Sequence, residues 1–572
     1  MARNERRLRV IGGGLLAAAT LATRLPFRAK TLFEFDSINF AVAAFRFDLR
    51  EVTPQMPGYI LHVLLGRLFY GFTGDLNSAY IWVSILLSVG SVLLLWRAAA
   101  QLRGERVGII AALIWLTTPL FWFHGEVAAI YAHEAFFASC LLYLGLKLLN
   151  RSPNSSTANH SGTYILLFVA LSLAGAARQS DLLFFLPATV YVLWKSRVPV
   201  KNLALGVLSF AITSALWLGE LLRESGGLTT YLHFARHEIN FKTQSILFGN
   251  SFKSQLDLMA KVLFTVPVAM GASFLLLVLI FVFAPKRSFS FIKTHATNVK
   301  ARFVVLLALP AFLFYFTIFF MKAGYLLNVV PSGILIAAVF IDQSAIWIAE
   351  RVKHAPEYQH RLTRPIITRN VAVLTGCAVV INCLWFFVQW PGTTQERYDN
   401  ENTRNSFVHG AINRFDNSRE RLLTLANRAL EYTNLSGIRA VDNINEITFN
   451  ALKANGAADS GQVILATWWS RWAYLQLPHA TTYDIEVDYS RPGALAVGKA
   501  SALHRDNSYD SVIILHTHHP VLLLMRHDRP DFEMFNYQVH LERIPTAEYL
   551  DIYRIEDSTF TLHWGDRIFV KP

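Results

Sequence analysis

The sequence predicts a mainly α-helical, polytopic membrane bundle followed by a small soluble α/β domain. Hydrophobic residues make up 53% of the 572 residues, charged residues only 16%, and the mean hydropathy is +0.34. A soluble globular domain carries roughly 25% charged residues. The apolar residues also arrive in blocks of helix length separated by short polar segments, which is the pattern of a protein with several membrane spans.

The apolar blocks predict about eleven spans. The first block follows a basic N-terminus, a pattern shared by cleaved signal peptides and uncleaved first spans. The many spans that follow favour an uncleaved first span. The other predicted spans lie near 79–96, 107–123, 132–149, 163–177, 181–195, 202–222, 260–284, 303–321, 324–349 and 370–390.

The placement of charge predicts the orientation of these spans. Lys and Arg number 22, against four acids, in the connections 1–9, 97–106, 147–151, 195–201, 286–302 and 350–369. Basic loops mark the cytoplasmic side of a membrane, so the N-terminus is expected inside and, with an odd span count, the C-terminal region outside. The formal net charge of +13 is thus a topology signal, and nucleic acid is excluded as a partner.

The outer side is then expected to hold a long loop, 31–77, directly after the first span. Within it, Pro57–Tyr70 is apolar but short, and it contains His62 and Arg67. These features favour an interfacial helix that lies along the membrane over a further span. The other outer stretches are 124–131, 178–181, 223–258, 322–324 and 391–572.

The C-terminal region changes character and predicts a second domain, 391–572, after a transmembrane domain, 1–390. An amphipathic helix is expected over 404–434. Short strands are expected in "GQVILAT", "YDSVIILH" and "DRIFVKP", and a strand followed by a helix in "ILATWWSRWAYLQLP". The three cysteines all lie in apolar segments, and an external domain without cysteine is typical of a bacterial envelope. We therefore expect a multi-pass inner-membrane protein.

Acidic residues in the first outer loop are the first candidate site. Asp36 and Asn39 share a face if 36–45 is helical, whereas Glu34 and Asp36 do not. A carboxylate at a membrane surface, beside apolar walls, can gain proton affinity and act as a general base. The alternative is an ordinary solvated loop.

A second candidate lies in "PLFWFHGEVAAIYAHEAFF", between the third and fourth predicted spans. His124, Glu126, His133 and Glu134 all fall beside this one turn. Ionisable groups are costly at the mouth of a membrane bundle, which favours a functional role. The alternative is a charged turn between spans.

Basic residues on the predicted outer face are the third candidate. Arg178 and Lys322 run against the positive-inside bias. Cations in such a place suit an anionic head group, because a departing phosphate needs positive charge. Harmless snorkelling is the alternative. Loop 223–258 adds a possible basic wall, with Arg223, His233, Arg236, His237 and Lys242.

The histidine and tryptophan clusters of the C-terminal region do not by themselves indicate a functional site. His516, His518 and His519 lack an acid or cysteine at ligand spacing, so no metal site is assigned, although a divalent metal is left open. Trp468, Trp469 and Trp472 are typical of core packing as well as of sugar stacking. No phosphate-binding loop, dinucleotide fingerprint or HExxH motif is present in the sequence, which argues against a nucleotide-driven pump.

Four blocks in order resemble the GT-C glycosyltransferases of family 39, which include protein O-mannosyltransferases and the lipid A aminoarabinose transferase. The blocks are "FEFDSINFAVAAFRFDL…QMPGYILHVLLGRLF", "FWFHGEVAAIYAHEAFF", "AGAARQSDLLFFLP" and "KAGYLLNVVP". The resemblance covers roughly residues 8–390. One departure is that the usual "HPPGYP" stands here as "QMPGYI", so no role of that histidine carries over.

The resemblance implies an inverting transfer of a sugar from a polyprenyl-phosphate carrier to a hydroxyl acceptor outside the membrane. Asp36 is then the general base, and Glu126 the second catalytic acid that orients acceptor or donor. Arg178 and Lys322 are expected to stabilise the leaving phosphate. The remaining substrate-binding candidates, some of them wall residues, are Glu34, Asn39, Gly58, Tyr59, His124, His133, Gln179, Gly324 and Tyr325.

The acceptor class stays open between a lipid, a glycan and a protein, and the sugar is not specified. The alternative function is a membrane transporter or lipid flippase with an external binding domain. Transporters place ionisable groups near the midplane on broken, repeated helices, whereas here the candidates gather on one predicted face. A structural or sensory membrane protein would leave Asp36, Glu126 and Lys322 without a shared task.

Overall fold

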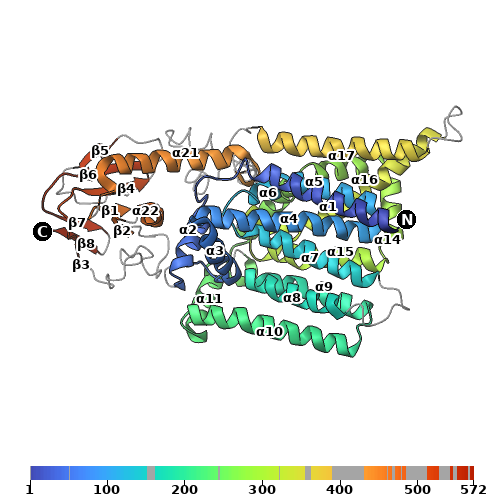
Figure 1. Cartoon of the computed structure of the whole chain (residues 1–572), viewed down its shortest axis with the longest axis horizontal. Coiled ribbons are helices and arrows are strands. Elements are labelled where there is room, and N and C mark those ends of the chain that lie inside the picture. The colour runs from blue at the N-terminus through green and yellow to red at the C-terminus, as the bar shows by residue number, and fades with distance from the viewer. Residues whose placement is uncertain are drawn as a thin grey trace. The chain divides into compact units, whose positions relative to one another are not determined.

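The structure, a computed structural model, describes residues 2–49, 52–150, 161–242, 245–320, 322–353, 363–388, 431–459, 461–466, 470–477, 479–484, 512–526, 541–544, 550–564 and 567–572. The chain divides into two compact units, and most of their helices and strands are labelled in Figure 1. The bundle unit comprises Met1–Ala29, Gln55–Trp390 and Leu425–Ser436. The second unit comprises Lys30–Pro54, Pro391–Thr424 and Gly437–Pro572.

The bundle unit is helical. Its α-helices are α1 (Ala2–Arg24), α3 (Ile60–Thr73), α4 (Leu76–Arg103), α5 (Glu105–Thr117), α6 (Pro119–His124), α7 (Tyr131–Leu149), α8 (Ser161–Ala177), α9 (Gln179–Lys195), α10 (Val200–Glu224), α11 (Leu228–Lys242), α12 (Phe252–Met270), α13 (Ala272–Phe283), α14 (Pro285–His295), α15 (Val299–Thr317), α16 (Val330–Lys353) and α17 (Thr363–Phe387). Short 3₁₀ turns are η3 (Ile246–Phe248), η4 (Ala323–Asn328) and η5 (Glu431–Thr433).

Six helices of the described chain are long and apolar enough to cross a membrane. They are α4, α7, α10, α15, α16 and α17, and the bent pair α12–α13 makes a seventh if it counts as one span. Each predicted apolar block thus contains one or two helices, and the predicted membrane helix bundle is confirmed. The count of eleven spans and the orientation stay predictions.

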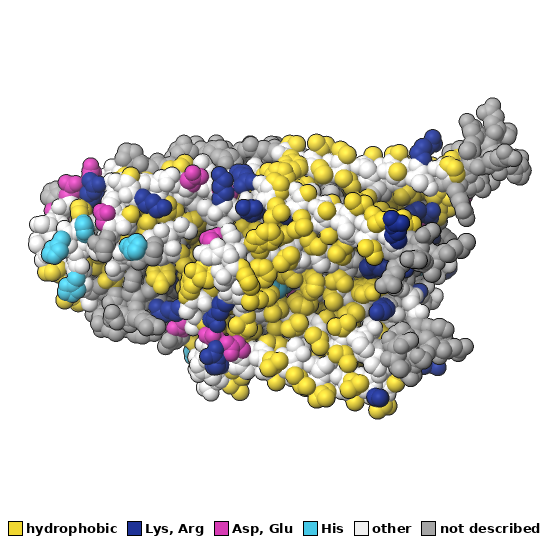
Figure 2. All heavy atoms as spheres, viewed as in Figure 1, with side chains coloured by type: hydrophobic (Ala, Val, Ile, Leu, Met, Phe, Trp, Pro, Cys, Tyr) yellow, Lys and Arg dark blue, Asp and Glu magenta, His cyan; other side chains and the backbone are white. Residues whose placement is uncertain are grey.

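The outer surface of the bundle is apolar where lipid is expected. Figure 2 shows hydrophobic side chains over its helices and Lys and Arg side chains toward the end where the N-terminus lies. On α10, for example, Leu208, Ile212 and Leu216 are exposed. Inside, small residues let helices approach: a Cβ on Gly145 of α7 would come within 2.2 Å of the Phe303 ring of α15.

The predicted span 260–284 is not one continuous helix. It consists of α12 and α13, which meet at a bend of 98°. Gly271 forms the break with a φ of +56°, a conformation that favours glycine. The Asn382 side chain from α17 accepts a hydrogen bond from the first amide of α13, Ala272 N, at 2.8 Å. This side chain satisfies a donor that the helix itself leaves open.

The predicted span 324–349 also begins differently. Its first residues form η4, and α16 starts only at Val330. Gly324 and Tyr325 therefore lie in a 3₁₀ turn outside the long helix. The short apolar segment after Pro57 is helical as predicted, in α3, while its interfacial position stays a prediction.

The second unit contains two small sheets. The strands are β1 (Val463–Ala466), β2 (Thr481–Asp484), β3 (Val512–Ile514), β4 (Val521–Arg526), β5 (Leu541–Ile544), β6 (Leu550–Ile555), β7 (Phe560–Trp564) and β8 (Arg567–Lys571). One sheet has the order β2-β1-β4-β6-β5, with β1 parallel to both neighbours and β6 antiparallel to β4 and β5. The other has the order β3-β8-β7. The predicted α/β character is confirmed.

The helices of the second unit are α2 (Phe35–Phe45), α22 (Ser470–Gln476), most of α21 (Leu435–Leu452), and the π-helical turn η6 (Lys453–Ala457). Leu465, Leu523 and Phe569 belong to the apolar core between the strands. The predicted strand in "GQVILAT" followed by a helix is confirmed by β1 and α22. The helix predicted over 404–434 lies almost wholly outside the described residues.

The first part of the predicted outer loop, up to Pro54, belongs to this second unit. Asp442 of α21 accepts hydrogen bonds from Lys30 N and Thr31 N, both at 2.9 Å, and Asn445 donates to Thr31 Oγ1 at 2.9 Å. Compactness therefore groups Lys30–Pro54 with the C-terminal residues. The domain boundary at residue 390 stays a prediction made from the chain order.

Candidate active site

Arg178 is the centre of a buried polar network in the bundle unit. It precedes α9, and its Nη1 donates to Glu134 Oε1 of α7 at 2.7 Å. Its guanidinium carbon lies 3.9 Å from the centre of the Tyr325 ring. Burial alone lowers the pKa of Arg178, but the Glu134 carboxylate raises it, and the pKa lies well above its usual value. Arg178 is therefore a fixed cation.

Asn328 and Asp181 extend this network. Asn328 Nδ2 donates to Asp181 Oδ1 at 3.1 Å and to Tyr315 Oη at 2.8 Å. Tyr315 in turn stacks on Tyr325, with ring centres 5.8 Å apart. Glu134 Oε2, Asp181 Oδ2 and Asn328 Oδ1 have no hydrogen-bond partner among the described residues. Buried acceptors are seldom left unpaired, so we expect water or a substrate group to supply donors here.

The turn before α3 packs against the start of α9. Gly58 and Tyr59 have φ of 97° and 42°, a left-handed region that costs a side chain such as that of tyrosine about 1–3 kcal/mol. Gln179 Nε2 donates to Pro57 O at 3.1 Å. Because Gln179 follows Arg178, this hydrogen bond holds the "PGY" turn near Arg178.

Close packing also fixes η4. A Cβ on Gly324 would come within 2.5 Å of the Tyr131 ring, so only glycine lets η4 approach the start of α7. The Tyr131 and Tyr325 rings lie 5.7 Å apart. Gly324 and Tyr325 are thus held against the same wall as Arg178.

Glu126 lies in a second buried cluster of the bundle unit. Its Oε1 accepts from Trp122 Nε1 at 2.6 Å, and its charge acts on the buried Arg24 at the end of α1. Arg24 Nη2 donates to Leu116 O at 2.7 Å. Glu126 is fully buried, and the Trp122 indole orients its carboxylate while Arg24 supplies a nearby positive charge.

His124 links this cluster to Lys322. Its ring lies 4.7 Å from the Tyr131 ring. Burial, together with the positive charge of Lys322, lowers the pKa of His124 to about 3. His124 is therefore neutral at physiological pH. Lys322 is half-buried, just before η4.

His133 faces a different neighbour. Its ring meets the edge of the His62 ring at 5.0 Å, and His62 lies against Tyr80 at 4.5 Å. His133 Nδ1 is 3.1 Å from Ile130 O. His133 thus packs between α3 and α4, although Glu134, the next residue, joins the Arg178 network.

Asp36 belongs to the second unit. It is half-buried in the first turn of α2, where the helix N-terminus favours a carboxylate. Glu34 is the residue before α2. Asn39 is buried, and its Oδ1 accepts from Arg471 Nη1 of α22. Asp36 and Asn39 share a helix, as predicted, and Asn39 is engaged by Arg471.

No group of three or more His, Cys, Asp and Glu that could hold a metal ion occurs among the described residues. Trp472 is buried and stacks on Phe449 at 4.6 Å, as core packing predicts. Trp468 and Trp469 lie outside the described residues.

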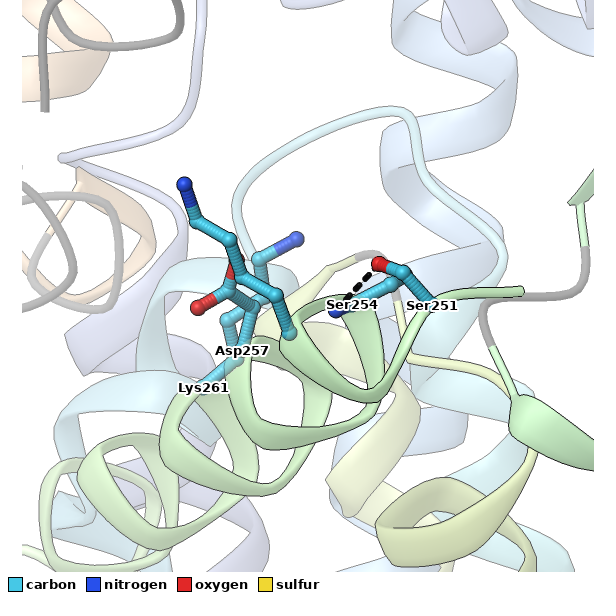
Figure 3. A pocket seen from close by; sticks show the side chains of 5 residues that line it. Ser251, Ser254, Asp257 and Lys261 are labelled. Atoms are coloured by element: carbon cyan, nitrogen blue, oxygen red, sulfur yellow. Dashed lines mark hydrogen bonds between the residues drawn. The ribbon is translucent and has the colours of Figure 1, made fainter.

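A shallow pocket lies on the first turns of α12, at the end of the predicted loop 223–258. Figure 3 shows its lining, Ser251, Lys253, Ser254, Asp257 and Lys261, all within one stretch of chain. Ser251 Oγ accepts from Ser254 N at 3.2 Å. The pocket adds lysines to the basic side chains predicted for this part of the chain.

The structure thus brings Arg178, Gln179, Gly58, Tyr59, Gly324 and Tyr325 together, and the charge of Lys322 acts on His124. The sequence interpretation gave no role to Asp181, Asn328 or Tyr315, and it named Glu134 without a task. One signal was available: Glu134 and Arg178 are opposite charges at the ends of neighbouring apolar blocks. Asn328 and Tyr315 carried no such signal, because single polar residues in membrane helices are common.

Comparison with known proteins gives a family match over part of the chain and a common fold over nearly all of it. Residues 54–218 match the family described as dolichyl-phosphate-mannose-protein mannosyltransferase. No curated protein matches the chain in sequence. Among solved structures, ArnT from Cupriavidus metallidurans bound to undecaprenyl phosphate has a TM-score of 0.54 at 14% identity, covering 97% of this chain and 98% of that one.

The apo state of the same ArnT gives a TM-score of 0.53 at 14% identity, with the same coverage. The oligosaccharyltransferase AglB from Archaeoglobus fulgidus, in complex with an inhibitory peptide and a dolichol-phosphate, has a TM-score of only 0.43 at 11% identity, covering 91% of this chain and 70% of that one. The likeness to ArnT shows a common fold along nearly the whole chain. Within this fold, the segment 54–218 matches a mannosyltransferase family.

Proposed function

We propose that the protein transfers a sugar from a polyprenyl-phosphate-linked donor to a hydroxyl acceptor on the extracytoplasmic face, with inversion at the sugar carbon. The family match over 54–218 supports the sugar transfer. The undecaprenyl phosphate bound to ArnT supports a polyprenyl-phosphate donor. The basic connections on the opposite side of the predicted spans support an outward-facing site. The acceptor is a lipid, a glycan or a protein.

Two cations stabilise the phosphate as it leaves. Lys322 is half-buried and lies before a turn that glycine holds against Tyr131, so its ammonium is the direct contact. Arg178 is already paired with Glu134, and it acts from behind the Tyr325 ring. Positive charge fixed in place before the reaction stabilises the developing negative charge without reorganisation.

Asp36 takes the proton of the acceptor hydroxyl. The resemblance assigns it this role, and its half-buried place in the first turn of α2 leaves the carboxylate reachable. Glu126 orients acceptor or donor as the second acid. Its hydrogen bond from Trp122 and its burial suit a carboxylate that orients a substrate and does not exchange a proton with it.

The remaining predicted residues shape the site. Gly58, Tyr59, Gly324 and Tyr325 form walls, and the helix after the "PGY" turn borders the path of the lipid tail. Gln179 fixes the turn through Pro57. Glu34, Asn39, His124 and His133 stay candidates for contacts with substrate. The bilayer is the route by which the donor arrives.

The observation that carries the proposal is the family match, which spans the "PGY" turn, Glu126, Glu134 and Arg178. The test uses the full chain in lipid nanodiscs with a radiolabelled polyprenyl-phosphate sugar and an envelope extract as acceptor source. Asp36→Asn should slow release of polyprenyl phosphate by roughly 10²–10⁴-fold, the usual contribution of a general base, while donor binding is retained.

Asp48→Asn, in the same loop, is the matched control and should keep the parental rate. Turnover of Asp36→Asn at the parental rate removes Asp36 from the base role. A product with retained anomeric configuration contradicts direct inverting transfer. Absence of any polyprenyl phosphate release by the parent, with several donor sugars, would refute the proposed donor class.

A further inference from the structure

Helix α14 is a short amphipathic element at the end of the bundle where the N-terminus lies (Figure 1). The apolar helix α13 ends at Phe283, and Ala284 breaks it with a φ of −138° and a ψ of 49°. Pro285 then starts α14, as proline often does at the first helical position. The chain therefore turns from a fully apolar helix into a separate helix with two different faces.

The inner face of α14 is anchored to the bundle. Phe291 packs at 5.3 Å from Phe340 of α16, and Arg103 of α4 lies 5.3 Å from the Phe291 ring centre. Ser288 is buried on the same side. Arg287 lies 3.4 Å from Glu350. These contacts fix which side of α14 faces away from the protein.

The outer face combines apolar and basic side chains. Phe289 is 64% exposed and Ile292 41%. Lys286, Phe289 and Lys293 follow helical spacing, so they share a face. Neither lysine forms an ion pair among the described residues, and both are exposed. An exposed apolar strip between two lysines is the pattern of a helix that lies in a membrane interface.

The charges around α14 favour a negatively charged ligand on its outer face. Residues 285–302 contain five Lys and Arg and no acid. Two acids described near this end are engaged, since Asp342 pairs with Arg106 and Glu350 with Arg287. The apolar surface continues onto α13 through Phe283, which is 74% exposed. Figure 2 shows basic side chains toward this end of the bundle, beyond the apolar band.

We propose that the outer face of α14 binds anionic glycerophospholipids. Lys286 and Lys293 hold the phosphate-bearing head groups, while Phe289, Ile292 and Phe283 lie among the upper acyl chains. Each basic residue near an anionic membrane surface is worth a roughly fivefold gain in affinity, so the two lysines together give roughly thirtyfold. Zwitterionic lipids lack the net charge and gain little from the lysines.

Native mass spectrometry of the full chain tests the proposal. The protein is released from micelles that hold equal amounts of phosphatidylglycerol and phosphatidylcholine with the same acyl chains. We expect the parent to retain phosphatidylglycerol preferentially. The double variant Lys286→Gln, Lys293→Gln should lower that enrichment at least severalfold. Thirtyfold is roughly the upper limit, because other basic sites of the protein also bind lipid. Lys453→Gln with Arg543→Gln, the same charge change in the second unit, should leave it unchanged.

Hydrogen exchange then locates the effect. In nanodiscs of phosphatidylglycerol, the amides of 285–295 should exchange more slowly than in phosphatidylcholine, and the Lys286→Gln, Lys293→Gln variant should lose this difference. Phe289→Ser should lower retention of both lipids, which separates apolar from ionic binding. The proposal is overturned if the lysine variant keeps the full enrichment, or if exchange over 285–295 is the same in both lipids.

Discussion

Removing the charge of Glu134 should destabilise the bundle far more than removing a similar carboxylate at its surface. Glu134 is fully buried and Arg178 nearly so, with 2.7 Å between Oε1 and Nη1. Glu134→Gln leaves the guanidinium buried without its carboxylate. Breaking a buried ion pair by neutralising one partner costs about 3–5 kcal/mol. Asp181 remains nearby and compensates in part, which favours the lower end of that range.

A matched control exists in the same unit. Arg67 and Glu224 are also 2.7 Å apart, but their side chains are 29% and 17% exposed, so water replaces the lost partner. Glu224→Gln should therefore cost about 1 kcal/mol or less. Both free energies of unfolding come from titration of the purified protein in mixed micelles with increasing SDS.

A double variant isolates the pair. Glu134→Gln combined with Arg178→Met should lose less stability than the two single changes added together, because the second change removes the unpaired charge. A coupling of about 1–3 kcal/mol is expected for residues in contact. Additive losses, or a Glu134→Gln cost equal to that of Glu224→Gln, would refute the assignment of Arg178 and Glu134 as a coupled pair.

Three further outcomes are expected. Lys322→Ala should lower polyprenyl phosphate release by roughly 10²-fold or more, since one preorganised group for developing charge is lost; an unchanged kcat and KM would exclude contact with the phosphate. Gly271→Ala should cost more than about 1 kcal/mol of stability, because φ is +56° and its Cβ would lie 2.6 Å from Asn382 Oδ1, whereas Gly376→Ala meets nothing within 4 Å and should be neutral. Since the pKa of His124 is lowered to about 3 from 6.5 when unfolded, the unfolded chain binds the extra proton below pH 6.5, and stability falls toward acid. This histidine should account for about 2 kcal/mol between pH 7 and 5, and His124→Gln should flatten that part of the SDS titration series; an equal slope in parent and variant contradicts the burial argument.

The fold was largely predictable because helices that cross a membrane need long apolar segments, which are visible in the sequence. Each apolar block contains a helix, and the alternation in the C-terminal region predicts β1, α22 and β8. The break at Gly271 was not predictable, since hydropathy registers apolar content and not a backbone φ. The start of α16 at Val330 escaped prediction for the same reason: "AGYLL" is apolar whether it forms a 3₁₀ turn or a span.

The site was predictable only where residues lie next to a motif. Arg178, Gly58 and Tyr325 could be named because they stand in blocks that resemble a family. Glu134 received no role, since its partner is 44 residues away in sequence and pairing is a matter of three-dimensional packing. Asn328 could not be assigned for the same reason, because its two acceptors come from α9 and α15.

The hydrogen bonds between Asp442 and the backbone at Thr31 have a consequence for the stability of the proposed base. Asp36 lies on a segment that packs with the C-terminal residues, although in sequence it follows the first helix. A substitution that destabilises α21 is therefore expected to loosen the segment that carries Asp36, at a great distance along the chain.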